Sequence, residues 1–90
     1  MFADLGTRAR VVIVEAGEVR GDRGMVKAVG YDGSRNVKLT AWGDENDRVS
    51  DLGKVLLGVG VGDKVDAGGR VTESEKYGVE LALVELRRVP

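Results

Sequence analysis

Residues 25–42 constrain the fold more than any other part of this chain, because two alternating runs flank a turn there. The turn is Asp32-Gly33-Ser34-Arg35, whose Asp, Gly and Ser reverse a chain at little energetic cost. On both sides apolar residues recur at every second position, which is the period of a half-buried strand. A hairpin closed by this turn pairs position 31 with 36, 29 with 38, 27 with 40 and 25 with 42. The sequence therefore predicts a β-hairpin whose two faces can be assigned residue by residue.

The two faces of this hairpin differ in chemistry. One face is small and apolar and is predicted to face a core; it consists of Val26, Ala28, Gly30, Val37, Leu39 and Ala41. The other face mixes cations, a hydroxyl and aromatic rings; it consists of Met25, Lys27, Val29, Tyr31, Lys38, Thr40 and Trp42. A face that meets only solvent needs no aromatic rings. We therefore interpret the second face as a candidate binding surface.

Length and composition predict one domain, residues 1–90, with an ordered core. A chain of 90 residues buries roughly two-thirds of its unfolded surface, and 42% hydrophobic residues argue against disorder. No apolar run approaches the roughly 20 residues of a membrane span, and the first eight residues lack the apolar segment of a signal peptide. We expect no membrane partner.

The chain contains neither cysteine nor histidine. Without cysteine it has no disulfide and no thiolate metal site, which fits a cytoplasmic location. Without histidine it lacks the commonest general base and the commonest zinc ligand. The acids at 44–47 lack the spacing of a calcium loop, and the glycines at 58–62 match no nucleotide-binding fingerprint. We predict no enzyme, catalytic residue, metal or cofactor.

Charge is distributed unevenly along the chain, although the formal net charge is only −1. Residues 20–42 carry five cations and two acids, a local +3, whereas residues 43–66 carry three cations and six acids, a local −3. Such polarity allows one face to attract an anion. Ordinary mixed surface charge is the alternative, because segments of sequence are not yet surfaces.

The remaining patterns predict an all-β fold with one helix. Residues 8–15 read as a first strand, Gly17 as a kink or bulge, and 18–24 as a polar loop. After the hairpin, Asp44 is a plausible N-cap for a short, irregular helix on which Val49, Leu52, Val55 and Leu56 recur at helical spacing.

Two further strands are expected at 65–72 and 79–89, joined by a polar loop at 73–78. The apolar alternation of the second of these strands changes phase near Val84. Five strands with a helix between the third and fourth make the five-stranded Greek-key barrel called the OB-fold.

The motif Val37-Lys38-Leu39-Thr40-Ala41-Trp42-Gly43 resembles the third-strand signature of replication protein A-like single-stranded DNA-binding proteins, especially the archaeal single-OB type. The segments 62–65 and 77–81 resemble the openings of the fourth and fifth strands of that family. The resemblance implies that Trp42 stacks on a base and that Tyr77 approximates a second stacking aromatic. The family's fourth-strand aromatic is missing, and Arg70 stands near its place.

We therefore predict sequence-tolerant binding of single-stranded DNA, favoured over RNA, in a groove across the second and third strands, closed by loops 16–24 and 73–78. Aromatics would stack bases and cations would neutralise phosphates. The predicted contacts are Trp42, Tyr77, Tyr31, Lys38, Thr40, Lys27, Arg20, Arg23, Arg70 and Lys76. Trp42 and Tyr31 could instead be packing residues, and any cation alone could be a solvated charge. The alternative function is an OB-fold protein–protein interaction module of a larger nucleic-acid-processing complex.

Overall fold

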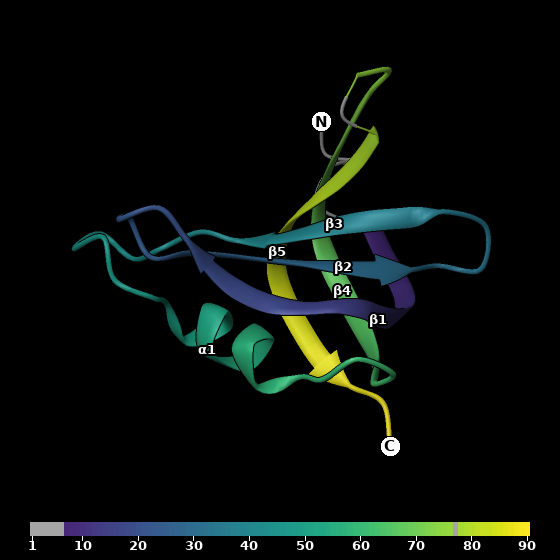
Figure 1. Cartoon of the computed structure of the whole chain (residues 1–90), viewed down its shortest axis with the longest axis horizontal. Coiled ribbons are helices and arrows are strands. Elements are labelled where there is room, and N and C mark those ends of the chain that lie inside the picture. The colour runs from purple at the N-terminus through teal and green to yellow at the C-terminus, as the bar shows by residue number, and fades with distance from the viewer. Residues whose placement is uncertain (1–6, 77) are drawn as a thin grey trace.

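A computed structural model describes residues 7–76 and 78–90, which form a closed β-barrel with one helix (Figure 1). The elements are β1 (Thr7–Arg20), β2 (Met25–Tyr31), β3 (Asn36–Ala41), α1 (Asp51–Gly58), β4 (Lys64–Ser74) and β5 (Gly78–Arg88). The strand order around the barrel is β1-β2-β3-β5-β4, with β3 and β5 parallel and the other pairs antiparallel. This is the OB-fold, with the short helix between β3 and β4 that the sequence predicts. No helix among the described residues is long and apolar enough to cross a membrane.

The register of the β2–β3 hairpin is the predicted one. Tyr31 pairs with Asn36, and the ladder continues through 29 with 38 and 27 with 40. The turn is held by Asp32, whose carboxylate accepts the backbone N–H groups of Ser34 and Arg35, each at 2.9 Å. These two bonds stabilise the ionised carboxylate and so lower the pKa of Asp32 below its ordinary value. Every residue of the predicted core face is buried.

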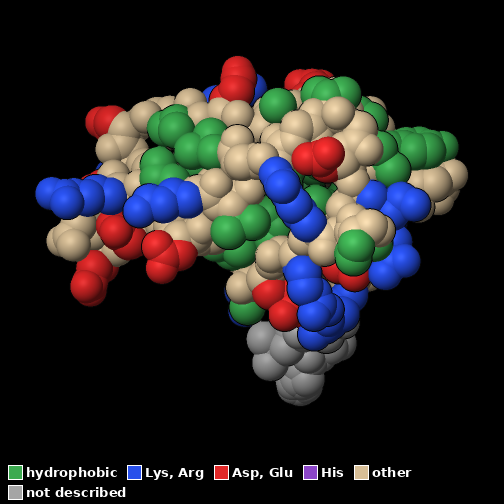
Figure 2. Space-filling model, turned by 90° about the horizontal axis from the view of Figure 1, so that it is seen from below, with side chains coloured by type: hydrophobic (Ala, Val, Ile, Leu, Met, Phe, Trp, Pro, Cys, Tyr) green, Lys and Arg blue, Asp and Glu red, His purple; other side chains and the backbone are tan. Residues whose placement is uncertain are grey.

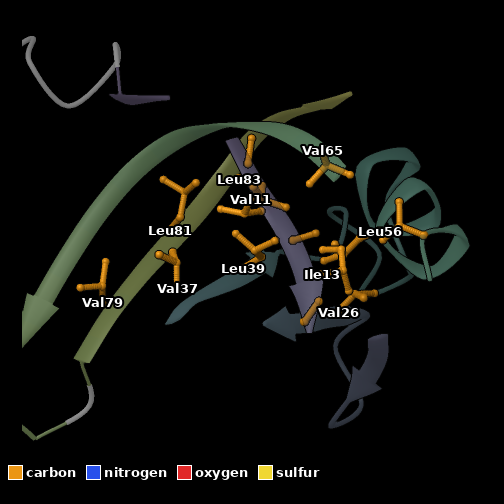
Figure 3. Close-up of a cluster of buried hydrophobic side chains, with 14 residues drawn as sticks. Val11, Ile13, Val26, Val37, Leu39, Leu56, Val65, Val79, Leu81 and Leu83 are labelled. Atoms are coloured by element: carbon orange, nitrogen blue, oxygen red, sulfur yellow. The ribbon is translucent and has the colours of Figure 1, made fainter. Parts of the chain in front are cut away.

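The core runs the length of the barrel and receives side chains from all the strands and from α1 (Figure 3). Leu56 of α1 lies beside Ile13 and Val26 at one end, and Val79 lies at the other. The helix approaches β1 closely at Gly17, where a Cβ would lie only 2.8 Å from the carbonyl oxygen of Leu56. The helix therefore closes one end of the barrel, and a small residue is required where it packs on β1.

The predicted N-cap of the helix is wrong. The cap is Ser50, whose side-chain oxygen accepts the backbone N–H of Gly53 at 3.0 Å. The carboxylate of Asp44 instead accepts the N–H groups of Asn46 at 2.8 Å and Arg48 at 3.0 Å, which closes a loop before the helix. These bonds lower the pKa of Asp44. Asp is favoured both at caps and in such local turns, so residue type alone could not separate the two positions.

The first strand is longer than predicted, and the predicted loop at 18–24 shrinks to a turn at 21–24. Gly21 and Gly24 adopt positive φ angles of 72° and 74°, which glycine accepts without steric cost. The ladder with β2 shifts register on both sides of Glu15, so the bulge expected near Gly17 is present. The resulting β1–β2 arm projects beyond the barrel beside residues 43–48 (Figure 1).

The last two strands also extend into their predicted loop, because Glu73 and Ser74 belong to β4 and Gly78 to β5. The phase change predicted near Val84 is confirmed. Gly68 pairs with Glu85 and Gly69 with Leu83, so Val84 is the extra residue of a bulge and is 72% exposed.

Candidate nucleic-acid interface

The outward residues of the barrel line up in two neighbouring rows, because residues paired across strands point to the same face. One row consists of Glu18, Lys27, Thr40, Ala82 and Arg70. The next row consists of Glu15, Val29, Lys38, Glu80 and Thr72. We call the surface made by these two rows the outer face. It contains the exposed side of the predicted hairpin, extended by β1 on one flank and by β5 and β4 on the other.

The charges of the outer face are balanced, which the sequence did not indicate. Its two rows bring three cations (Lys27, Lys38 and Arg70) together with three acids (Glu15, Glu18 and Glu80). The Nζ of Lys27 lies 3.6 Å from Oε2 of Glu80. The local +3 of residues 20–42 is therefore offset by carboxylates from β1 and β5. Strand alternation could indicate that Glu80 points outward. Which residues lie beside Glu80 depends on how the strands close into a barrel.

A hollow of about 350 Å³ lies on this face, beside the bulge of β1. Its lining consists of Glu15, Ala16, Glu18, Arg20, Lys27, Ala28, Val29 and Lys38. Three of the predicted cations, from three different strands, meet in this hollow. Arg20 stands at the end of β1 opposite Met25, with its guanidinium 3.8 Å from Glu18. The hollow therefore brings three cations and two acids, a local +1, together with the apolar residues Ala16, Ala28 and Val29.

The two aromatic residues of the hairpin lie at opposite ends of the outer face. Trp42 follows β3 and is 60% exposed; continuing the register places it opposite Met25, at the end where Arg20 stands. Tyr31 is 43% exposed, and its hydroxyl donates to the carbonyl oxygen of Gly33 at 3.0 Å. Trp42 comes six positions after Asn36, the partner of Tyr31. At about 3.3 Å per residue the two rings are roughly 20 Å apart along the hairpin.

Thr40 lies on the outer face, but its side chain is buried rather than presented to solvent. Its relative exposure is 0%, and its hydroxyl donates to Oε2 of Glu80 at 2.5 Å. The same carboxylate oxygen lies 3.6 Å from Lys27 Nζ, so the pair of charged side chains covers the hydroxyl. A threonine between two long, mutually attracting side chains is buried even on an outward position.

The other predicted contacts are more dispersed. Arg23 is exposed in the turn at 21–24, and Lys76 is exposed in the turn after β4. Arg70 stands in the row of Lys27 but three strands away, which is about 14 Å at the usual strand spacing. Tyr77 lies outside the described residues. The structure thus gathers Arg20, Lys27 and Lys38, and leaves Arg23, Arg70 and Lys76 at the margins.

Elsewhere on the barrel, charges also occur in pairs. Arg8 lies 2.6 Å from Glu85, and Arg10 lies 2.8 Å from Asp66 and donates to both of its oxygens. That hydrogen-bonded pair lowers the pKa of Asp66 and raises that of Arg10. Seen from below, Asp and Glu side chains stand among the Lys and Arg side chains (Figure 2). Within residues 7–76 and 78–90, no three acids group closely enough to hold a metal ion.

Comparison with known proteins identifies the fold. No protein-family model matches the chain, and no curated protein matches it. Among solved structures, the SSB domain of a protein from Synechococcus sp. superposes with a TM-score of 0.72 at 18% identity, over 91% of this chain and 92% of that one. A putative aspartyl-tRNA synthetase from Leishmania major superposes with a TM-score of 0.72 at 17% identity. That match covers 96% of this chain but only 18% of the synthetase. At these identities the likeness establishes an OB-fold, the architecture that the strand order and the barrel closure already show.

Proposed function

We propose that this protein binds single-stranded nucleic acid along the outer face, DNA in preference to RNA, with little sequence preference overall. The observation that carries the proposal is Trp42, a large aromatic side chain that is 60% exposed at the end of the face. The Trp42 ring is exposed to solvent, whereas the barrel buries the side chains of Leu39, Leu56 and Leu81 almost completely. Stacking of one base on such a ring contributes about 1–3 kcal/mol and depends little on which base it is.

The rest of the face supports a strand that runs from Trp42 towards Tyr31. Next to the Trp42 end, the hollow offers Arg20, Lys27 and Lys38 to phosphates. Tyr31 presents a second ring at the far end. OB-folds commonly bind oligonucleotides on the face formed by their second and third strands, and the SSB domain from Synechococcus has this fold. The proposal is for a binding module and not for an enzyme, since the chain has no histidine or cysteine.

The balanced charge of the outer face favours the second candidate, a protein–protein interaction module of a larger nucleic-acid-processing complex. Glu15, Glu18 and Glu80 would oppose phosphates, whereas a protein partner could pair with both signs. We favour nucleic acid because a stacked ring needs no net positive charge.

The deciding experiment is a fluorescence titration, because Trp42 is the single tryptophan of the sequence. Oligo-dT should quench its emission saturably at low salt, and a duplex of the same length should do so much less. Oligo-dU against oligo-U, which differ only in the 2′-hydroxyl, tests the preference for DNA. If single strands show no affinity even at low salt, the nucleic-acid function is refuted and the protein-interaction module becomes the better account.

A further inference from the structure

Glu80 is one of the three acids of the outer face that a simple phosphate-binding surface does not explain. It stands fourth of five in its row, between Lys38 of β3 and Thr72 of β4. Its side chain is 32% exposed, so its charge is felt at the surface. A carboxylate at this position repels phosphates and so weakens the attraction of the face for a polyanion, whereas a neutral side chain would not. Its location therefore calls for a role other than phosphate binding.

The Glu80 carboxylate is held by a hydrogen bond from β3, the neighbouring strand, and by an ion pair with a lysine of β2. The hydroxyl of Thr40, which is 0% exposed, donates to Oε2 at 2.5 Å, and Nζ of Lys27 lies 3.6 Å from the same oxygen. An ionised carboxylate has about four acceptor positions on its two oxygens, so these contacts leave it able to accept more hydrogen bonds. Glu80 is thus a fixed hydrogen-bond acceptor whose orientation is set before any ligand arrives.

A hollow that Glu80 helps to line provides space for a ligand group. Glu80 lines a hollow of about 270 Å³ together with Thr72, Glu73, Ser74 and Gly78. At Gly78, no atom outside its two chain neighbours lies within 4 Å of the position that a Cβ would take. The volume is just below the range of about 300–1,000 Å³ typical of small-molecule sites, which suits a group the size of one nucleobase.

We propose that Glu80 reads the Watson–Crick edge of an unpaired guanine at one position of the bound strand, a local preference that rests on the proposed and otherwise sequence-tolerant binding of single strands. Guanine presents two adjacent donors on that edge, N1–H and the N2 amino group, which match the two oxygens of a carboxylate. Adenine and cytosine place a ring-nitrogen acceptor beside their amino group, and thymine flanks its one N–H with two carbonyl oxygens. Those acceptors repel a carboxylate, so the other three bases bind less well. In single strands these edges are free to be read.

A purely structural role makes a different prediction. If the contacts among Lys27, Thr40 and Glu80 only brace β2, β3 and β5, removing them would change stability and affect all oligonucleotides alike. A base reader changes the discrimination between bases instead. The test must therefore compare ligands that differ at one edge, with stability measured separately.

The test compares three oligonucleotides of about ten nucleotides, which is within the usual site size of an OB-fold. They are an alternating thymine–guanine strand, an alternating thymine–inosine strand, and oligo-dT as the reference. Inosine keeps N1–H but lacks the N2 amino group. We expect the thymine–guanine strand to bind about tenfold tighter than oligo-dT at fixed salt, within the range of a good two-bond base contact, and the inosine strand to fall between them. Glu80→Gln should remove the guanine preference while oligo-dT binding is retained or tightened. Glu85→Gln, which removes an acid paired with Arg8, is the matched control and should keep the preference.

Two further variants test how Glu80 is positioned. Thr40→Val removes the hydroxyl that orients the carboxylate and should weaken the guanine preference, and Thr40→Ser should restore it. Circular dichroism of each variant verifies the fold. Equal binding of all three strands by the unmodified protein, or a guanine preference that survives in Glu80→Gln, overturns the inference and leaves the proposed function standing. Failure of every strand to bind refutes the proposed function, and the inference with it.

Discussion

Replacing Trp42 by alanine tests whether its ring stacks on a base or packs against the protein. A stacked base contributes about 1–3 kcal/mol, so the dissociation constant should rise roughly 5- to 150-fold. The cost in stability should be smaller than for a core aromatic. Truncating a fully buried aromatic to alanine costs about 3–5 kcal/mol. Trp42 is 60% exposed, so about two-fifths of that cost, roughly 1–2 kcal/mol, is expected.

Fluorescence anisotropy of a labelled oligo-dT is the appropriate assay, because the variant lacks the only tryptophan. Urea unfolding followed by circular dichroism measures the stability of the same samples. Trp42→Phe keeps a flat ring and should lose less affinity than Trp42→Ala. Tyr31→Phe, which removes only the hydroxyl bonded to Gly33, should bind like the unmodified protein. If the alanine variant binds normally but loses 3 kcal/mol or more of stability, on the scale of a buried aromatic, Trp42 is packing and the stacking argument is refuted.

Three other variants test the core, the loop and the electrostatics. Leu39→Ala, at 0% exposure, should lower the free energy of unfolding by about 2–5 kcal/mol; a loss below about 0.5 kcal/mol in urea unfolding would contradict its burial. The pKa of Asp44 in the folded protein is lowered from the ordinary 3.8. The contribution of its carboxylate to stability is therefore present above pH 3.8 and is lost as the pH falls through the lowered pKa. Asp44→Asn should therefore be less stable than the unmodified protein at neutral pH, with the gap closing in strong acid, and a constant gap would count against the loop bonds. Two to four phosphate contacts predict a slope of log affinity against log salt of roughly −1.4 to −2.8, and Lys38→Ala should flatten it by about 0.7; an unchanged slope would mean that Lys38 touches no phosphate.

The sequence predicted the β2–β3 hairpin correctly because its determinants are local. A turn of Asp, Gly and Ser fixes the pairing of the strands beside it, and period-2 alternation then assigns every side chain to a face. The pairing of Tyr31 with Asn36 and the burial of Leu39 follow from those two facts. The exposure of Trp42 was predicted for the same reason.

Features that depend on distant segments were not predictable in this way. Glu80 reaches Lys27 and Thr40 only because β5 pairs in parallel with β3, a contact between residues forty positions apart. Summing charge along a segment cannot detect such neighbours. The same pairing buries Thr40 under an ion pair, although alternation alone places it outside. The extension of β1 to Arg20 was missed because polar residues on a projecting arm look like a loop.

The balance of charges on the outer face also determines how binding should respond to salt. Each cation that meets a phosphate releases counterions, which makes affinity depend on salt, but Glu15, Glu18 and Glu80 repel the same phosphates. The net electrostatic attraction is then small, and base stacking must supply most of the free energy of binding. A shallow slope together with a large loss in Trp42→Ala is the combination that this surface predicts. A slope steeper than about −2.8 would require more phosphate contacts than the face can offer, and would place part of the bound strand on cations outside it, such as Arg23 of the β1–β2 arm.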